Sequence, residues 1–130
     1  MKIECISNEL TERQRQELGI VGAIRQAITP GKVYVVLGIS IMPNRSKNGT
    51  GVFFEIENDW GQCRSISSCL FKITDDRCSK YWKARAGERG GFCIWPEHFY
   101  QEYFHDDLEE GRQEVKNIFR EIVDQLSNEF

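Results

Sequence analysis

The sequence predicts an α+β fold, with an N-terminal helix, a small curled antiparallel sheet like a half-barrel, and C-terminal helices packed on the sheet. Three observations predict it. Short apolar runs follow one another too closely for crossover helices, so their strands must pair antiparallel. The C-terminal residues repeat apolar side chains every three or four positions. The length of 130 residues suits one domain with its own core. We therefore expect a single domain over residues 1–130.

The first element is a helix over residues 10–28. Thr11 and Gln14 have the spacing of a capping box, in which each side chain binds the backbone of the other. Apolar residues then recur with a helical period at Leu18, Val21, Ile24 and Ile28. The Thr29-Pro30-Gly31 turn ends the helix.

Strands occupy the middle of the chain. Residues 32–42 have apolar side chains on both faces, which is typical of a central strand. Residues 52–57 alternate as a second strand, and a turn over residues 58–61 follows. Two shorter strands are expected at residues 68–73 and 92–95. The basic, glycine-containing stretch between them predicts a long surface loop.

Helices complete the chain. Pro96 can open one of them, since proline is tolerated at the first helical position. If residues 97–105 are helical, His98, Glu102 and His105 share a face that can hold a metal or an acid–base pair. The interleaved aromatics favour an ordinary amphipathic helix instead. Residues 107–129 form the clearest helix, capped by Asp106 or Asp107, with the apolar stripe Val115, Ile118, Phe119, Ile122, Val123 and Leu126.

Five cysteines and the absence of catalytic motifs limit the chemistry. An odd count without any C-x-x-C pair argues against a disulfide framework and against a zinc ribbon. Cys93 lies in an apolar run and is expected to be a small buried hydrophobe. Asp75 and Asp76 suit a strand-ending turn better than a carboxylate site. No phosphate loop, nucleophile elbow or dinucleotide fingerprint is present. We expect no enzyme, no metal and no cofactor.

Charge is unevenly distributed around a formal net charge of −3. Residues 61–95 carry seven basic and three acidic side chains, whereas residues 96–130 carry three basic and ten acidic ones. An acidic end beside a basic middle can indicate that the protein binds a partner. On charge alone, a solvated helix face is the better interpretation. The N-terminal residues have no apolar signal region, and no apolar run is long enough for a membrane span. The sequence therefore predicts a cytoplasmic protein.

Four segments resemble a known family. They are Gly31–Ile39, Leu70–Trp82, Pro96–Gly111 and Arg112–Phe130, and their order resembles that of small bacterial immunity proteins, including those of contact-dependent growth inhibition systems. The resemblance implies a cytosolic non-enzyme that binds one cognate toxin domain, often a nuclease, and blocks it. It is a likeness of layout and short strings, so it assigns no binding residue.

An acidic surface suits such a partner, because a nuclease site is lined with basic side chains. The carboxylates near the aromatic cluster are the first candidates: Glu97, Glu102, Asp106, Asp107, Glu109 and Glu110. Asp75 and Asp76 are further candidates, and Trp82 and Tyr100 are candidate aromatic anchors. For any one of these residues, a purely structural role is the alternative.

Two other functions compete with toxin binding. Residues 64–89 interleave Tyr81 and Trp82 with basic side chains, which suits a module that binds single-stranded nucleic acid. The negative net charge opposes this alternative. An enzyme that uses His98 or His105 as an acid–base group ranks last, since no substrate class is indicated.

Overall fold

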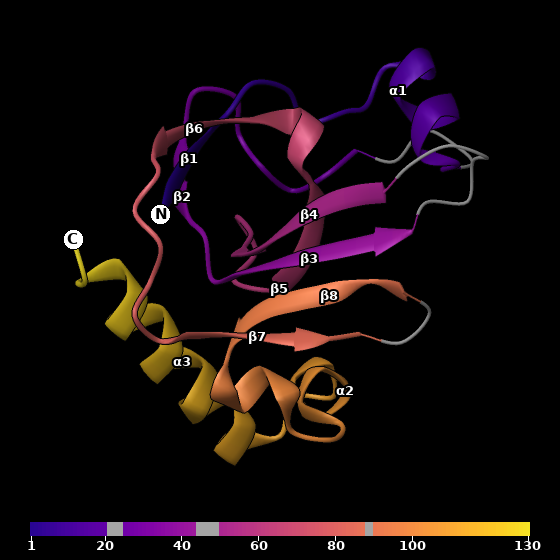
Figure 1. Ribbon diagram of the computed structural model, residues 1–130. Coiled ribbons are helices and arrows are strands. Elements are labelled where there is room, and N and C mark those ends of the chain that lie inside the picture. Colours follow the sequence, from indigo (N-terminus) through magenta and orange to yellow (C-terminus); the bar gives the residue numbers. More distant parts are fainter. Residues whose placement is uncertain (21–24, 44–49, 88–89) are drawn as a thin grey trace.

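The computed structural model describes residues 1–20, 25–43, 50–87 and 90–130 (Figure 1). Two antiparallel sheets and the helices form an α+β fold, as predicted. The small sheet has the strand order β2-β1-β6, and the large sheet has the order β5-β4-β3-β8-β7. The elements are β1 (Lys2–Cys5), α1 (Glu12–Leu18), β2 (Val33–Val35), β3 (Gly38–Pro43), β4 (Thr50–Glu57), β5 (Cys63–Ser67), the 3₁₀ turn η1 (Ser68–Leu70), β6 (Phe71–Asp75), β7 (Trp82–Ala86), β8 (Phe92–Pro96), the 3₁₀ turn η3 (Glu97–Tyr100), α2 (Phe104–Glu109) and α3 (Gln113–Ser127).

The N-terminal helix is much shorter than predicted. The capping box is confirmed, since the Gln14 N–H donates to Thr11 Oγ1 at 3.1 Å and the Thr11 N–H donates to Gln14 Oε1 at 2.9 Å. The helix ends at Gly19, whose φ of 68° is a left-handed conformation that glycine adopts without strain. Arg25, predicted to be helical, instead forms a β-bridge with Glu9. The predicted helical positions 21–24 lie outside the described residues.

The single strand predicted over residues 32–42 is two strands in two sheets. β2 pairs with β1 in the small sheet, and β3 pairs with β4 and β8 in the large sheet. Between them, Val36 enters the core between the sheets, whereas Leu37 enters the core under the helices. Both faces of this segment are therefore apolar because one end packs in the core between the sheets and the other end packs in the core under the helices.

Three strands were not expected from the sequence: β1, β5 and β7. The last of these lies inside the predicted loop over residues 74–91 and pairs with β8 at the edge of the large sheet. An edge strand can carry charged side chains, so β7 lacks the apolar pattern by which strands are predicted from a sequence. The turn over residues 58–61 is confirmed, and Asn58 Oδ1 accepts the N–H groups of Trp60 and Gln62.

The large sheet lies between the small sheet and the helices (Figure 1). One core joins the two sheets and buries Ile3, Tyr34, Val36, Phe54, Ile56, Ile66 and Phe71. The other core lies under η3, α2 and α3 and buries Leu37, Phe99, Phe104 and the α3 stripe. Trp82 packs against both cores. The prediction that C-terminal helices pack on the sheet is confirmed.

The helix predicted over residues 107–129 is divided into α2 and α3. Gly111 has a φ of 80° and separates them. In α3, Val115, Phe119, Ile122 and Leu126 are buried, and Ile118 and Val123 pack beside them, which confirms the predicted stripe. Asp106 and Asp107 lie in the first turn of α2 and do not cap it, because Tyr103 is the N-cap residue. Pro96 precedes a 3₁₀ turn and not an α-helix.

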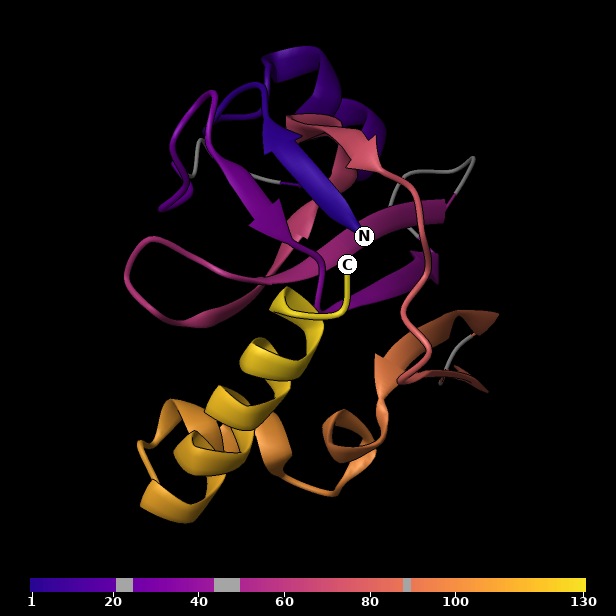
Figure 2. The ribbon, with the colours of Figure 1, turned by 90° about the vertical axis from the view of Figure 1, so that its left-hand side faces the viewer.

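The two chain ends lie near each other on one side of the molecule (Figure 2). The Glu129 carboxylate accepts the hydroxyl of Ser79 at 2.7 Å and the N–H of Lys80 at 3.1 Å. The Arg77 guanidinium lies 4.3 Å from the centre of the Phe130 ring. The C-terminal residues thus hold the segment that connects β6 to β7.

Candidate protein-binding site

The predicted acidic residues lie along η3 and α2, which follow β8 and cover one face of the large sheet. Glu97 begins η3, Glu102 lies between η3 and α2, and the other four lie in α2 or at its end. The structure divides these residues into two groups, according to whether a basic side chain of the same chain neutralises them.

Three of the six form ion pairs within the protein. The Glu97 carboxylate forms ion pairs with Arg85 at 2.8 Å and with Lys83 at 3.1 Å, and these cations lower the pKa of its carboxyl group. Glu109 accepts Arg64 at 2.8 Å, and Asp107 lies 3.5 Å from Arg112. These carboxylates attach η3 and α2 to neighbouring segments. Their charge is therefore already used in the free protein.

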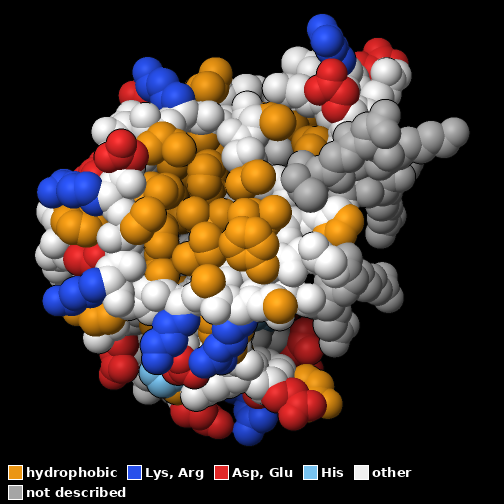
Figure 3. All heavy atoms as spheres, in the orientation of Figure 1, with side chains coloured by type: hydrophobic (Ala, Val, Ile, Leu, Met, Phe, Trp, Pro, Cys, Tyr) orange, Lys and Arg blue, Asp and Glu red, His pale blue; other side chains and the backbone are white. Residues whose placement is uncertain are grey.

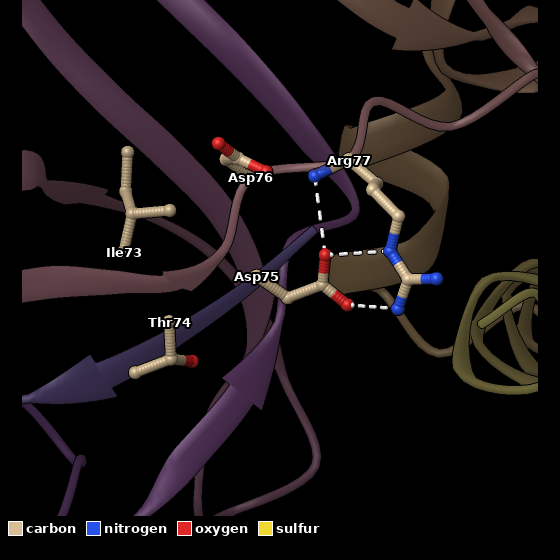
Figure 4. A pocket seen from close by; sticks show the side chains of 5 residues that line it. All are labelled: Ile73, Thr74, Asp75, Asp76 and Arg77. Atoms are coloured by element: carbon tan, nitrogen blue, oxygen red, sulfur yellow. Dashed lines mark hydrogen bonds and ion pairs between the residues drawn. The ribbon is translucent and has the colours of Figure 1, made fainter.

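Of the neighbouring residues Asp75 and Asp76, only Asp75 is paired with a basic side chain (Figure 4). Asp75 points toward Arg77, whose Nε–H and Nη2–H groups donate hydrogen bonds to the two carboxylate oxygens of Asp75 at 2.9 and 2.6 Å. This contact holds the pKa of Asp75 well below its usual range. Asp76 points away from the pair and is exposed. The two residues line an open hollow where β6 ends at Asp75. Asp75 Oδ1 accepts the Arg77 N–H at 3.1 Å, so the strand ends there as predicted and an irregular segment follows.

Glu102, Asp106 and Glu110 remain unpaired. All three are exposed, and no ion pair or side-chain hydrogen bond involves them in the part of the chain that the structure describes. The four-residue spacing brings Asp106 and Glu110 toward the same side of α2, whereas Glu102 precedes the left-handed Tyr103 at the start of that helix. Together with Tyr103, we call them the acidic turn. Its carboxylates are free to meet a basic partner.

Tyr103 has an unusual backbone. Its φ of 62° and ψ of 12° lie in the left-handed region, and it is the one non-glycine residue with positive φ among those described. Its side chain is 64% exposed, and no hydrogen bond or ring contact of it occurs among the described residues. Glycine or asparagine would hold this position with less strain. Strained, exposed residues concentrate at functional sites.

The two predicted aromatic anchors are held inside the fold. The indole N–H of Trp82 donates to the Leu37 carbonyl at 2.9 Å, and its ring contacts both cores. The Tyr100 hydroxyl accepts the Trp95 N–H at 3.2 Å and lies 2.6 Å from the Lys83 carbonyl oxygen. Both side chains are half-buried and have structural partners. Their role as anchors remains a prediction.

The shared face of His98, Glu102 and His105 does not form. Residues 97–100 are a 3₁₀ turn, and the left-handed Tyr103 separates it from α2, so the helical spacing is lost. His98 is exposed, whereas His105 faces inward and packs against the rings of Trp95 and Phe99. These three side chains therefore cannot form a metal site or an acid–base pair on a shared helix face.

The basic segment over residues 64–89 is largely neutralised. Arg64, Lys72, Arg77, Lys83 and Arg85 each pair with a carboxylate of the same chain. Lys80 instead lies over the Tyr81 ring, 5.2 Å from its centre, and Arg89 lies outside the described residues. Binding to a phosphate backbone depends on free positive charge. These ion pairs disfavour the nucleic-acid alternative.

Hydrophobic side chains gather in the middle of the face shown in Figure 3, where the small sheet meets the large one. The strand register places Ile39, Ile94 and Ala84 in one cross-strand row, and Ile41, Phe92 and Ala86 in the next. Phe92 is 41% exposed. Contiguous apolar surface of this kind is more typical of proteins that bind other proteins than of proteins that bind nucleic acid.

No protein-family model, curated protein or solved structure matches the chain. Among the helices that the structure describes, none is long and apolar enough to cross a membrane.

Two features of the structure have no clear signal in the sequence. Tyr103 belongs to the interleaved aromatics of residues 97–105, and no pattern in that run identifies a left-handed tyrosine. A cluster of Glu55, Cys63 and His105 was also missed, because its members come from three distant segments. Cys93 is buried as predicted. Cys5 is also buried, whereas Cys69 and Cys78 are exposed.

Proposed function

We propose that this protein is a cytoplasmic immunity protein that binds a cognate bacterial toxin domain and blocks it. The acidic turn carries the proposal. It contains three exposed, unpaired carboxylates and an exposed tyrosine with a left-handed backbone. Tyrosine is enriched among the residues that dominate binding energy at interfaces.

A nuclease toxin has the complementary surface. Its active site needs lysine, arginine and histidine to hold phosphate. Carboxylates aimed at such a site accelerate association and exclude partners of the wrong charge. The ion-paired acids, by contrast, would first have to lose Arg85, Arg64 or Arg112 before they could bind a new cation. We therefore assign recognition to Glu102, Asp106 and Glu110, with Tyr103 as the anchor.

Co-expression with the product of the gene immediately upstream tests this function. We expect that product to be toxic alone, to be neutralised by this protein, and to be captured with it in a pull-down. The variant Glu102→Lys/Asp106→Lys/Glu110→Lys should lose both capture and rescue while keeping a cooperative thermal melt.

A matched variant controls for net charge. Glu12→Lys/Glu121→Lys/Asp124→Lys makes the same charge change at exposed positions on α1 and α3. It should retain capture and rescue. Equal loss of binding in the two triple variants would show that overall charge, and not the acidic turn, attracts the partner. Binding to single-stranded RNA with a steep salt dependence, and none to the upstream product, would favour the nucleic-acid alternative.

A further inference from the structure

Three potential metal ligands meet between the large sheet and α2. They are Glu55 from β4, Cys63 from β5 and His105 from α2, and one ligand atom from each lies within 4.8 Å of the other two. Glu55 is only 5% exposed, and the other two are half-buried. A carboxylate, a thiol and an imidazole are the three side-chain ligand types that zinc uses in proteins.

One nitrogen of the His105 imidazole has no partner among the described residues. His105 Nε2 is buried and has no hydrogen-bond partner. The ring is held by aromatic neighbours, since its centre lies 5.3 Å from Trp95 and 5.0 Å from Phe99. Buried polar atoms in proteins almost always have a partner, so one without a partner requires an explanation. A metal ion at the cluster supplies one.

Hydrogen bonds from neighbouring side chains orient the Glu55 carboxylate. Ser40 Oγ donates to Glu55 Oε1 at 2.7 Å, and the Ser65 side chain also hydrogen-bonds this carboxylate. Ser40 in turn accepts the indole N–H of Trp95 at 3.0 Å. Outer hydrogen bonds of this kind fix the direction of a metal-ligating carboxylate. Glu55 is thus held in place by two hydroxyl groups and an indole.

Burial opposes charge on all three side chains of the metal-free cluster. Burial raises the pKa of Glu55 and of Cys63, and it lowers the pKa of His105. Arg64, which favours ionisation of Cys63, is paired with Glu109. A raised thiol pKa also argues against a nucleophilic Cys63, since catalysis needs the thiolate. A divalent cation would balance one carboxylate and one thiolate.

We propose that Glu55, Cys63 and His105 bind a Zn²⁺ ion, with water as the fourth ligand. Bonds of about 2.0–2.3 Å would bring the three ligand atoms to roughly 3.3–3.8 Å from one another, which requires only a small closure of the cluster. The ion ties α2 to β4 and β5. It therefore fixes the helix that carries the acidic turn, although the site can be tested without any partner.

Cobalt titration of the metal-free full chain, under reducing conditions, tests the site. We expect one Co²⁺ per chain, with the visible bands of a tetrahedral site and a near-ultraviolet charge-transfer band that requires a thiolate. Zn²⁺ should displace the cobalt and raise the melting temperature. Cys63→Ser should abolish the charge-transfer band and weaken binding by about 100-fold or more, since even outer partners contribute 10–100-fold.

The control variant is Cys69→Ser/Cys78→Ser, which removes the two exposed cysteines. It should bind cobalt like the wild-type chain. Because Cys63→Ser can disturb packing, His105→Gln provides a second test and should also lose the metal while its circular dichroism spectrum is unchanged. A charge-transfer band that survives in Cys63→Ser, or that disappears in the control, would overturn the proposal, as would the absence of any band in the wild-type chain.

Discussion

Replacing Tyr103 tests whether this residue is retained for a partner and not for the fold. A left-handed conformation costs an L-residue roughly 1–2 kcal/mol, and glycine avoids this cost. Glycine in turn loses roughly 0.5–1 kcal/mol through its greater freedom in the unfolded chain. Tyr103→Ala keeps the strain, because alanine retains a Cβ. Tyr103→Gly should therefore be more stable than Tyr103→Ala by about 0.5–1 kcal/mol.

Urea unfolding followed by circular dichroism measures this difference. The side chain of Tyr103 is 64% exposed, so its loss in the alanine variant should change the free energy of unfolding by no more than about 0.5 kcal/mol. The glycine variant should then equal or exceed the wild-type chain in stability. Both variants should bind the partner more weakly, and mainly through faster dissociation.

Two results would refute this reasoning. If glycine is no more stable than alanine, the backbone at residue 103 is not strained. If Tyr103→Ala loses more than about 2 kcal/mol, the side chain stabilises the fold, and its strain no longer points to a partner.

Four further predictions concern the fold. Phe119→Ala should lower the free energy of unfolding by about 3–5 kcal/mol in a chemical melt, because the ring is buried in the core under the helices. Ending the chain before Glu114 should remove that core and abolish the cooperative thermal transition; a sharp melt would contradict this. Asp59→Asn should reduce stability at pH 7 and flatten the acid limb of a pH titration. The cation and hydroxyls around Asp59 lower its pKa to about 2, so the wild-type carboxylate stabilises the fold above its ordinary pKa near 3.8, and that contribution is lost as pH falls toward 2. Gly38→Ala should lower the melting temperature, since a Cβ there would lie 2.7 Å from Trp95 Cδ1; an unchanged melt would show that this indole can move.

Features with strong local signals were predictable from the sequence. The α3 stripe follows directly from its apolar spacing, and the capping box at Thr11 depends on two nearby residues. The antiparallel pairing followed from the short distances between strands. In each case, the evidence lies within a few residues.

Features that depend on tertiary structure were not predictable in this way. Residues 33–43 have a continuous strand pattern, but the chain passes from one sheet to the other at Val36 and Leu37. Nothing in the sequence pattern marks this change. The helix after Asp107 was extended through Gly111, whose left-handed backbone divides it. Charge composition located an acidic region but could not separate paired from unpaired carboxylates. That distinction requires the positions of Arg64 and Arg85, which come from distant strands.

Hydrogen exchange of this protein, with and without the product of the upstream gene, tests the proposed surface most directly. We expect a stable complex in which exchange slows at the amides of residues 102–110, on and around α2. Amides of residues 64–86 should change little. A complex that protects only the apolar rows of β3 and β8, or only the basic segment, would contradict the assignment of recognition to the acidic turn, and the absence of a complex would contradict the proposed function.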